Sequence, residues 1–550
     1  MKHLLYLFLF LFLPQKNWGQ NLFLKIEGSS TIENQTLDSI TSPNKHIKNS
    51  YLNKEITSIS KNLIERGYIE HKILTNKKIN DTTQYIKYEL GYPIKKTHIR
   101  LGPYKKLLET NEDTVKIDFK KTNEALLNFT KILEKKGFPL TQIKLSNIKK
   151  RKQNLLSEIT IIEDSKRTIN RININGYQNF PKNHLQNIFK NHNKKVFNEN
   201  QLKKINKDFK KLPFCKTTKD AEILFKNDST SIYIYLEKQK RSTFDGYIGF
   251  TTQKNTLKLN GYLDLKLLNT LNWGEHFNVY WKNNGQEQTT FNLNIETPYI
   301  FKSPLILKGN LNIFKQDTTF QKTKSEIELG YLLNYNTRFY IGYQETESSD
   351  IQNANSKILT DYKNFFYTLS CQHINHNNNK TLFPEKTNLT FKIGTGKRNN
   401  FTNHTTQFFT SIELSHEFEL NNRNTFFIKS QNYYLNSNQY LTNELFRYGG
   451  INSIRGFNDN SLQCNLLSSI ISEYRYKVNS NLYIHSILDY AYTEDETQKT
   501  KNNLKSLGIG FYLTNKKNLI HIQYSNGISK NQNLNIKNSI FHISLSFNLQ

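Results

Sequence analysis

The side chains best suited to specific chemistry in this sequence lie between residues 449 and 489. Gly449-Gly450 precedes the tetrapeptide Ile454-Arg455-Gly456-Phe457, and two acidic residues, Glu473 and Asp489, follow it. Arginine carries a planar fork of donors that matches a carboxylate, and the glycines permit a tight path of the chain. We therefore predict a non-covalent cluster in which Arg455 pairs with Glu473 and Asp489. The alternative is an ordinary solvated loop.

The rest of the sequence shows no sign of an active site. It contains no GxSxG motif and no phosphate-binding P-loop, and its 14 histidines are scattered. Cys215, Cys371 and Cys464 are far apart and odd in number, which favours neither a zinc site nor a disulfide framework. We predict that the protein is not an enzyme, has no catalytic residues and uses no cofactor and no metal.

The elements that must position the arginine are alternating strands. Residues 257–267, 291–296, 389–393 and 520–524 each alternate apolar and polar side chains. A period of two with one apolar face indicates a sheet with one polar and one apolar side. Because this pattern continues over residues 241–550, we predict an all-β transmembrane barrel of about 16 antiparallel strands, and not a soluble sandwich.

The same counting orients the candidate site. It places Glu473, Arg475 and Asp489 on the side of their strands that faces the barrel lumen. A loop around residues 437–461 that folds into the lumen would bring Arg455 against the two carboxylates. We predict this lumen-directed loop as part of the barrel domain.

Residues ahead of the barrel mix strand and helix patterns. The segments 20–95, 96–168 and 169–240 each begin with a strand and close with two strands, and the helices of the first two end at Gly67-Tyr68 and Gly137-Phe138. Glycine just after a helix is its usual C-terminal cap. We predict three α+β modules with the order strand, helix, helix, strand, strand. This unit resembles the POTRA domain, whose exposed sheet edge suits the addition of a client strand; rigid spacers that bind nothing are the alternative.

The N-terminus and the composition narrow the class further. Residues 1–19 contain an apolar run too short to span a bilayer, as in a secretory signal peptide. Only 36% of the 550 residues are hydrophobic, yet 13% are aromatic, which excludes a long disordered chain. The formal charge of +30 comes from lysines spread along the chain, so we predict no nucleic-acid partner.

The tetrapeptide and its glycine pair resemble the (V/I)RGF/Y motif in the sixth extracellular loop of the BamA/TamA outer-membrane assembly superfamily. Glu473 resembles the acidic residue of that family's next strand, and residues 487–491 resemble its FxDxG segment, from which Leu488 and Ala491 depart. The resemblance covers essentially the whole chain after the signal, and three modules favour TamA-like members. It implies POTRA repeats followed by a barrel of about 16 strands.

The predicted last strand carries a second resemblance. The C-terminal recognition signal of outer-membrane barrels places apolar residues on one face, and this strand does the same with Phe541, Ile543, Leu545 and Phe547. The chain ends in Gln550, where that signal ends in Phe or Trp.

The family resemblance implies a function at the bacterial outer membrane, with the modules in the periplasm. Family members receive unfolded clients with those modules and aid their insertion or translocation through the lumen or through a weakly closed seam between the first and last strands. The implied partners are unfolded outer-membrane or secreted proteins, outer-membrane lipid and a periplasmic or inner-membrane partner of the modules. The alternative is a two-partner-type secretion pore for one dedicated substrate, although such pores usually carry two modules and an N-terminal plug helix.

Overall fold

The computed structural model describes residues 21–548 except for 42–44, 49–50, 163–164, 228, 254–255, 284–287, 354–355, 357, 377–382, 384, 401–403, 516–517, 531, 536 and 538. The predicted signal segment, residues 1–19, lies outside the described residues. No helix in the described ranges is long and apolar enough to cross a membrane. The chain forms two compact units: one holds residues up to 168 together with 196–200, and the other holds residues 169–195 and 201–550.

The first module is a four-stranded mixed sheet with the order β2-β1-β4-β3. Its elements are β1 (Asn21–Gly28), α2 (Thr31–Asp38), β2 (Lys45–Lys48), α3 (Leu52–Glu65), β3 (Lys72–Asn80) and β4 (Thr83–Glu89). Helix α3 is amphipathic and buries Ile59 and Leu63 in the core of the module. The helix stops at Gly67, whose φ of 99° is accessible mainly to glycine, and Tyr68 folds back onto the same core.

The second module has the sheet order β6-β5-β8-β7. Its elements are β5 (Lys96–Arg100), η2 (Gly102–Tyr104), β6 (Thr114–Asp118), η3 (Phe119–Lys121), α4 (Thr122–Lys135), β7 (Gln142–Arg151) and β8 (Asn154–Ile162). The prediction of two helices is wrong for this module, because two short 3₁₀ turns and the edge strand β6 precede α4 in the described chain. Residues 105–113 offer only Leu107 and Leu108 as apolar side chains, too few for the buried face of a helix.

The third module follows the predicted order of strand, helix, helix, strand, strand. Its elements are β9 (Ile169–Asn175), α5 (Lys182–His192), α6 (Glu199–Lys210), β10 (Cys215–Phe225) and β11 (Thr230–Lys238), and its sheet order is β10-β11-β9. Helix α6 buries Ile205 and Phe209. The Phe180 ring lies 5.9 Å from the rings of both Phe209 and Phe214, so an aromatic cluster fills the core.

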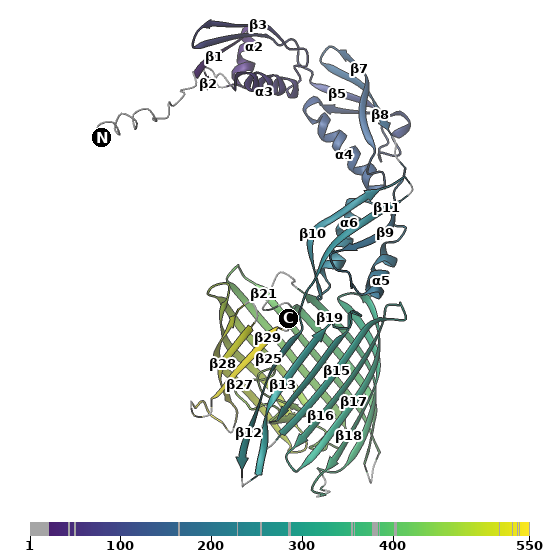
Figure 1. Cartoon of the computed structure of the whole chain (residues 1–550), viewed down its shortest axis with the longest axis vertical. Helices are drawn as coiled ribbons and strands as arrows, with labels where there is room; N and C mark the ends of the chain where they lie inside the picture. Colours follow the sequence, from purple (N-terminus) through teal and green to yellow (C-terminus); the bar gives the residue numbers. More distant parts are fainter. Residues whose placement is uncertain are drawn as a thin grey trace, which may run out of the picture. The chain divides into compact units, whose positions relative to one another are not determined.

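The remaining described chain forms a closed barrel of 16 strands, coloured from teal to yellow in Figure 1. The strands are β12 (Thr243–Gln253), β13 (Thr256–Leu268), β14 (His276–Asn283), β15 (Gln288–Ile300), β16 (Leu305–Gln316), β17 (Phe320–Asn334), β18 (Thr337–Asp350), β19 (Tyr362–His376), β20 (Glu385–Asn400), β21 (His404–Glu419), β22 (Asn424–Ser437), β25 (Leu466–Lys477), β26 (Leu482–Asp495), β27 (Thr500–Thr514), β28 (Asn518–Ile528) and β29 (Ile540–Asn548). Neighbouring strands pair antiparallel throughout, for example β12 with β13 and β28 with β29. The predicted fold class, α+β repeats followed by an all-β barrel, is confirmed.

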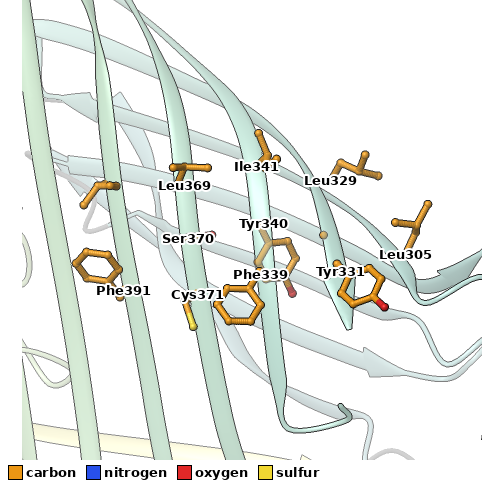
Figure 2. Close-up of a pocket in the computed structure, with 12 residues that line it drawn as sticks. Leu305, Leu329, Tyr331, Phe339, Tyr340, Ile341, Leu369, Ser370, Cys371 and Phe391 are labelled. Atoms are coloured by element: carbon orange, nitrogen blue, oxygen red, sulfur yellow. The ribbon is translucent and has the colours of Figure 1, made fainter. Parts of the chain in front are cut away.

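The barrel wall has an apolar outer face and a polar inner face. On β17, Leu329 and Tyr331 point outward and are exposed, whereas Glu328 points inward and is 1% exposed. A hollow of about 530 Å³ lies on the outer face. Figure 2 shows Leu329 beside Ile341 and Leu369 of the next two strands. Apolar side chains in continuous outward rows favour contact with lipid over contact with water.

Candidate functional site: the lumen loop and the strand seam

A long loop between β22 and β25, residues 438–465, contacts the inside of the barrel wall on several sides. It contains a small hairpin of β23 (Phe446–Tyr448) and β24 (Leu462–Cys464). Asn443 donates to the Ser348 hydroxyl of β18 over 2.9 Å, and Gln288 of β15 donates to the carbonyl oxygen of Asn460 over 3.3 Å. The loop that the sequence predicts around residues 437–461 therefore lies inside the barrel.

The Arg455 cluster, defined as Arg455, Glu473 and Asp489, joins this loop to β25 and β26. The Arg455 Nε and backbone N–H donate to Asp489 Oδ2 over 2.9 and 3.1 Å, and Nη1 donates to Glu473 Oε1. The remaining nitrogen, Nη2, donates to Asp489 Oδ1 and, over 3.2 Å, to the carbonyl oxygen of Ser472. Arg455 is 1% exposed. A buried charge is tolerated when it is paired and hydrogen-bonded, and each guanidinium nitrogen here has an acceptor.

Arg475 and Glu417 extend this cluster along the wall. Arg475 Nε donates to Glu473 Oε2 over 2.8 Å, and its Nη1 donates to Glu417 Oε2 of β21 over 2.9 Å. The Arg475 guanidinium also stacks on Phe427, with 4.2 Å between the guanidinium carbon and the ring centroid. Glu417 was not predicted as a partner, although its lumen-facing place in the alternation of β21 is a signal for it.

The glycines around Arg455 lie where the backbone geometry is tight. Gly456 has a φ of 77°, and a Cβ built on it would lie 2.3 Å from the backbone nitrogen of Gly527 on β28. Gly449 and Gly450 have φ values of 106° and 95°, and the Gly450 N–H donates to the carbonyl oxygen of Ile454 over 3.2 Å. Only glycine fits these positions without strain, so the predicted glycines shape the turn that presents Arg455.

Ile454 and Phe457, the apolar members of the tetrapeptide, anchor the same turn. Both are buried and pack in a lumen cluster with Leu467 and Ile471 of β25 and Leu504 of β27. The tetrapeptide therefore combines a buried ion pair with apolar contacts to the wall.

A second buried ion pair, which the sequence does not predict, holds the first part of the loop. Arg398 of β20 is 0% exposed, and its Nη1 pairs with Glu444 of the loop and donates to the carbonyl oxygen of Gln439 over 3.1 Å. Gln407 of β21 donates to the other oxygen of Glu444. The alternation of side chains along β20 places Arg398 on the lumen face, but nothing in the local sequence indicates that Glu444 is its partner.

The seam between the first and last strands is the weakest junction of the wall. Within the part of the chain that the structure describes, strands β12 and β29 share three residue pairs, Thr243 with Asn548, Phe244 with Phe547 and Asp245 with Ser546. Other neighbouring strands share between eight and 15 pairs within the described residues. Among the described side chains, one hydrogen bond crosses the seam, from the Ser546 hydroxyl to Asp245 Oδ2 over 3.1 Å.

The predicted C-terminal signal lies on the outer face of β29. Phe541, Ile543, Leu545 and Phe547 are 60%, 54%, 43% and 42% exposed. They form an apolar row beside the seam, while His542, Ser544 and Ser546 alternate with them toward the lumen.

The third module contacts the barrel through Tyr177 and His184. The Asn269 amide donates to the Tyr177 hydroxyl over 2.7 Å, and its oxygen accepts from the Gly274 N–H over 2.8 Å. His184 packs edge-on against Tyr299, with 4.5 Å between ring centroids. Burial lowers the pKa of His184 to about 3, so this imidazole is neutral at physiological pH. These contacts lie within one compact unit.

The described residues contain no cluster of side chains arranged for metal or thiol chemistry. No group of three or more His, Cys, Asp or Glu side chains in those ranges is arranged to hold a metal ion. Cys215, Cys371 and Cys464 are all free thiols.

Comparison with known proteins relates these features to one family. Residues 269–548 match the family described as the Omp85 superfamily domain. No curated protein matches the sequence. The solved structure of CdiB from Acinetobacter baumannii has 14% sequence identity and a TM-score of 0.51, and the match covers 82% of this chain and 90% of that one. At this identity the likeness shows a shared fold.

A further solved structure is similar over much of the chain. BamA from Haemophilus ducreyi, in a crystal structure lacking POTRA domains 1-3, has 13% identity and a TM-score of 0.47, with 80% of this chain and 95% of that one covered. Closeness to TamA-like members stays a prediction.

Proposed function

The chain belongs to the Omp85 superfamily, and from this premise we propose that it inserts unfolded client proteins into the outer membrane at the β12–β29 seam. The protein is an outer-membrane barrel with its N-terminal modules in the periplasm. Members of the family are transport and assembly factors, so the general role is protein insertion or translocation at that membrane.

The observation that carries the proposal is the shortness of the seam. Strand β12 pairs with β13 along residues 243–253, but it pairs with β29 only along residues 243–245. Strand β29 likewise pairs with β28 along residues 540–547. Residues 246–253 and 540–545 therefore present strand edges to each other without a shared ladder in the described chain.

Unpaired strand edges explain how such a barrel would act on a client. Backbone N–H and C=O groups without partners are costly inside a membrane, so an edge there readily accepts an added strand. Counted over the described residues, opening the seam breaks three residue pairs, whereas opening any other junction breaks at least eight. The seam is the place where a client strand enters at the lowest cost in hydrogen bonds.

The modules supply a receiving surface of the same kind. In the first module, β3 is an edge strand of its sheet, and eight of its nine residues are exposed. A sheet edge binds an extended chain through main-chain hydrogen bonds and tolerates varied side chains. This supports a role in holding unfolded clients; a periplasmic or inner-membrane partner would use the same type of edge.

A disulfide across the seam tests the proposal. Phe244 and Phe547 are Cα partners across β12 and β29, and Ile522 and Ile543 are Cα partners across β28 and β29. In a variant without native cysteines, paired cysteines at 244 and 547 should abolish client assembly when oxidised and restore it when reduced. The measurement is folding of radiolabelled barrel clients in proteoliposomes.

The 522–543 pair is the matched control, because it cross-links one side of β29 and leaves the seam free. Equal loss of assembly in both cross-linked proteins would contradict a specific role of the seam. If the protein with the 244–547 disulfide still translocates a secreted protein normally, the two-partner-type secretion pore is favoured instead, because its substrate passes through the lumen.

A further inference from the structure

The lumen contains a cavity of about 880 Å³ beside the first part of the loop. Its ionisable lining carries more basic than acidic groups. The lining groups are Lys266, Lys282, Lys308, Lys322, Lys324, Lys392 and Arg447 on the basic side and Asp264, Glu326, Glu444 and Asp459 on the acidic side.

Four of the basic side chains are neutralised by nearby carboxylates. The pairs are Lys266 with Asp264 at 2.9 Å, Lys308 with Glu328 at 2.8 Å, Lys282 with Asp459, and Lys392 with Glu326. The remaining acid of the lining, Glu444, is paired with Arg398. The positive excess of the cavity is therefore concentrated on the other three basic residues.

Lys322, Lys324 and Arg447 have no carboxylate within 4 Å among the residues that the structure describes. Lys322 and Lys324 are two residues apart on the lumen face of β17, and the Lys322 Nζ lies 3.5 Å from the carbonyl oxygen of Leu445 in the loop. Arg447 follows Leu445 by two residues. The three cations thus meet where the loop touches β17.

An aromatic surface fixes Arg447 at this place. Its guanidinium carbon lies 5.5 Å from the Phe320 ring centroid and 5.8 Å from that of Phe314. Phe314 is the Cα partner of Lys322, so the arginine is held directly beside the lysine. The Arg447 Nε is buried and has no hydrogen-bond partner in the described structure.

Three like charges in a confined cavity repel one another and carry unused donors, and both costs fall when an anion binds. The fork of an arginine and the point charges of two lysines suit phosphate oxygens. The wall separates this cavity from the lipid, so the anion must come from solution. We propose that Lys322, Lys324 and Arg447 bind a soluble multivalent oxyanion of the phosphate class, which bridges the loop to β17.

Such an anion acts on the loop independently of the identity of the client. The Arg455 cluster attaches the second half of the loop to β25 and β26, and the bound anion attaches the first half to β17. Because the anion contacts both loop and wall, it favours the state in which the loop lies in the lumen.

Calorimetric titration of the full-length protein in detergent with pyrophosphate, at low ionic strength, tests the site. We expect one site per chain, and Lys322→Gln, Lys324→Gln or Arg447→Gln should each weaken binding at least about tenfold, as for loss of one charge-assisted hydrogen bond. Lys266→Gln removes the same charge from the same cavity but from an ion-paired lysine. It should weaken binding by less than about threefold.

Trypsin cleavage of the loop provides a second readout that does not depend on variants. Pyrophosphate should slow cleavage after Arg447 in the unmodified protein. Three results would each overturn the proposal: absence of binding heat, equal weakening of binding by Lys266→Gln, and tighter binding of an acidic peptide of equal charge. The last result would assign the site to a client segment. Client assembly measured in phosphate-free buffer tests the seam mechanism without the anion. Failure of the anion site can therefore be told apart from failure of the seam mechanism.

Discussion

The barrel wall from β25 to β28 and the junction of β29 with β12 are held together in different ways. From β25 to β28, strands share between 10 and 14 residue pairs, and the loop adds the Arg455 cluster and the contact of Gly456 with Gly527. From β29 to β12 the described residues share three pairs and one side-chain hydrogen bond. Reinforcement thus stops one strand away from the seam, which lets the seam open without loss of the rest of the wall.

The largest expected effect comes from removing the arginine of the reinforced side. Arg455→Ala takes the partner cation from the buried Asp489 and one of two cations from Glu473, which keeps Arg475, and it should lower the free energy of unfolding by about 3–5 kcal/mol. Denaturant unfolding measures the change, and protease digestion should show the loop released. Arg423→Ala, in an exposed turn, is the control and should have no effect. Normal stability and a protected loop in Arg455→Ala would show that the cluster does not hold the loop.

Backbone hydrogen exchange compares the two sides directly. Amides of residues 246–253 and 540–545 that point toward the seam should exchange at least about 100-fold faster than those of β20, which shares 15 pairs with β19. The measurement is exchange followed by mass spectrometry in nanodiscs. Equal protection at both places would mean that the seam is closed by more than the three pairs.

A smaller effect is expected from the glycine that brings the loop against β28. Gly456→Ala places a Cβ 2.3 Å from the Gly527 backbone at a positive φ, which should destabilise the protein by about 1–3 kcal/mol. Gly309→Ala is the matched control, because a Cβ there has no heavy atom within 4 Å. Thermal unfolding of both variants checks the difference, and equal midpoints would argue against a tight contact.

The smallest effect is expected from a substitution in the β12–β29 seam. Ser546→Ala removes the hydrogen bond to Asp245, which should cost about 0.5–1.5 kcal/mol and speed exchange of the seam amides. Ser544→Ala, on the same face of β29, is the control. If both substitutions speed exchange equally, the Ser546–Asp245 contact contributes nothing specific.

Much of the architecture could be predicted because it depends on local periodicity. Alternation in residues 257–267 and 291–296 indicates strands with two different faces whatever their partners are, and Gly67 and Gly137 end helices through their own backbone freedom. The second module shows where this fails. Its first strand is short, and the segment after it has too few apolar residues for the helix that the repeat suggested.

The candidate site, like the fold, could be predicted only in part. The types and spacing of Arg455, Glu473 and Asp489 sufficed to predict a pair between a loop and the lumen face of two strands. Glu417, Glu444 and Gly527 were not predicted, because each meets its partner from a distant strand or loop position.

The sequence by itself determined the alternating strands, the helices that end at Gly67 and Gly137, the glycine turn and the lumen orientation of the carboxylates. These features follow from side-chain direction and backbone freedom over a few residues. Only the tertiary structure decided the length of the seam, the second ion pair of the loop and the three unpaired cations beside it. Those depend on how 16 strands close and in which register, and that register is set by contacts between residues far apart in the chain.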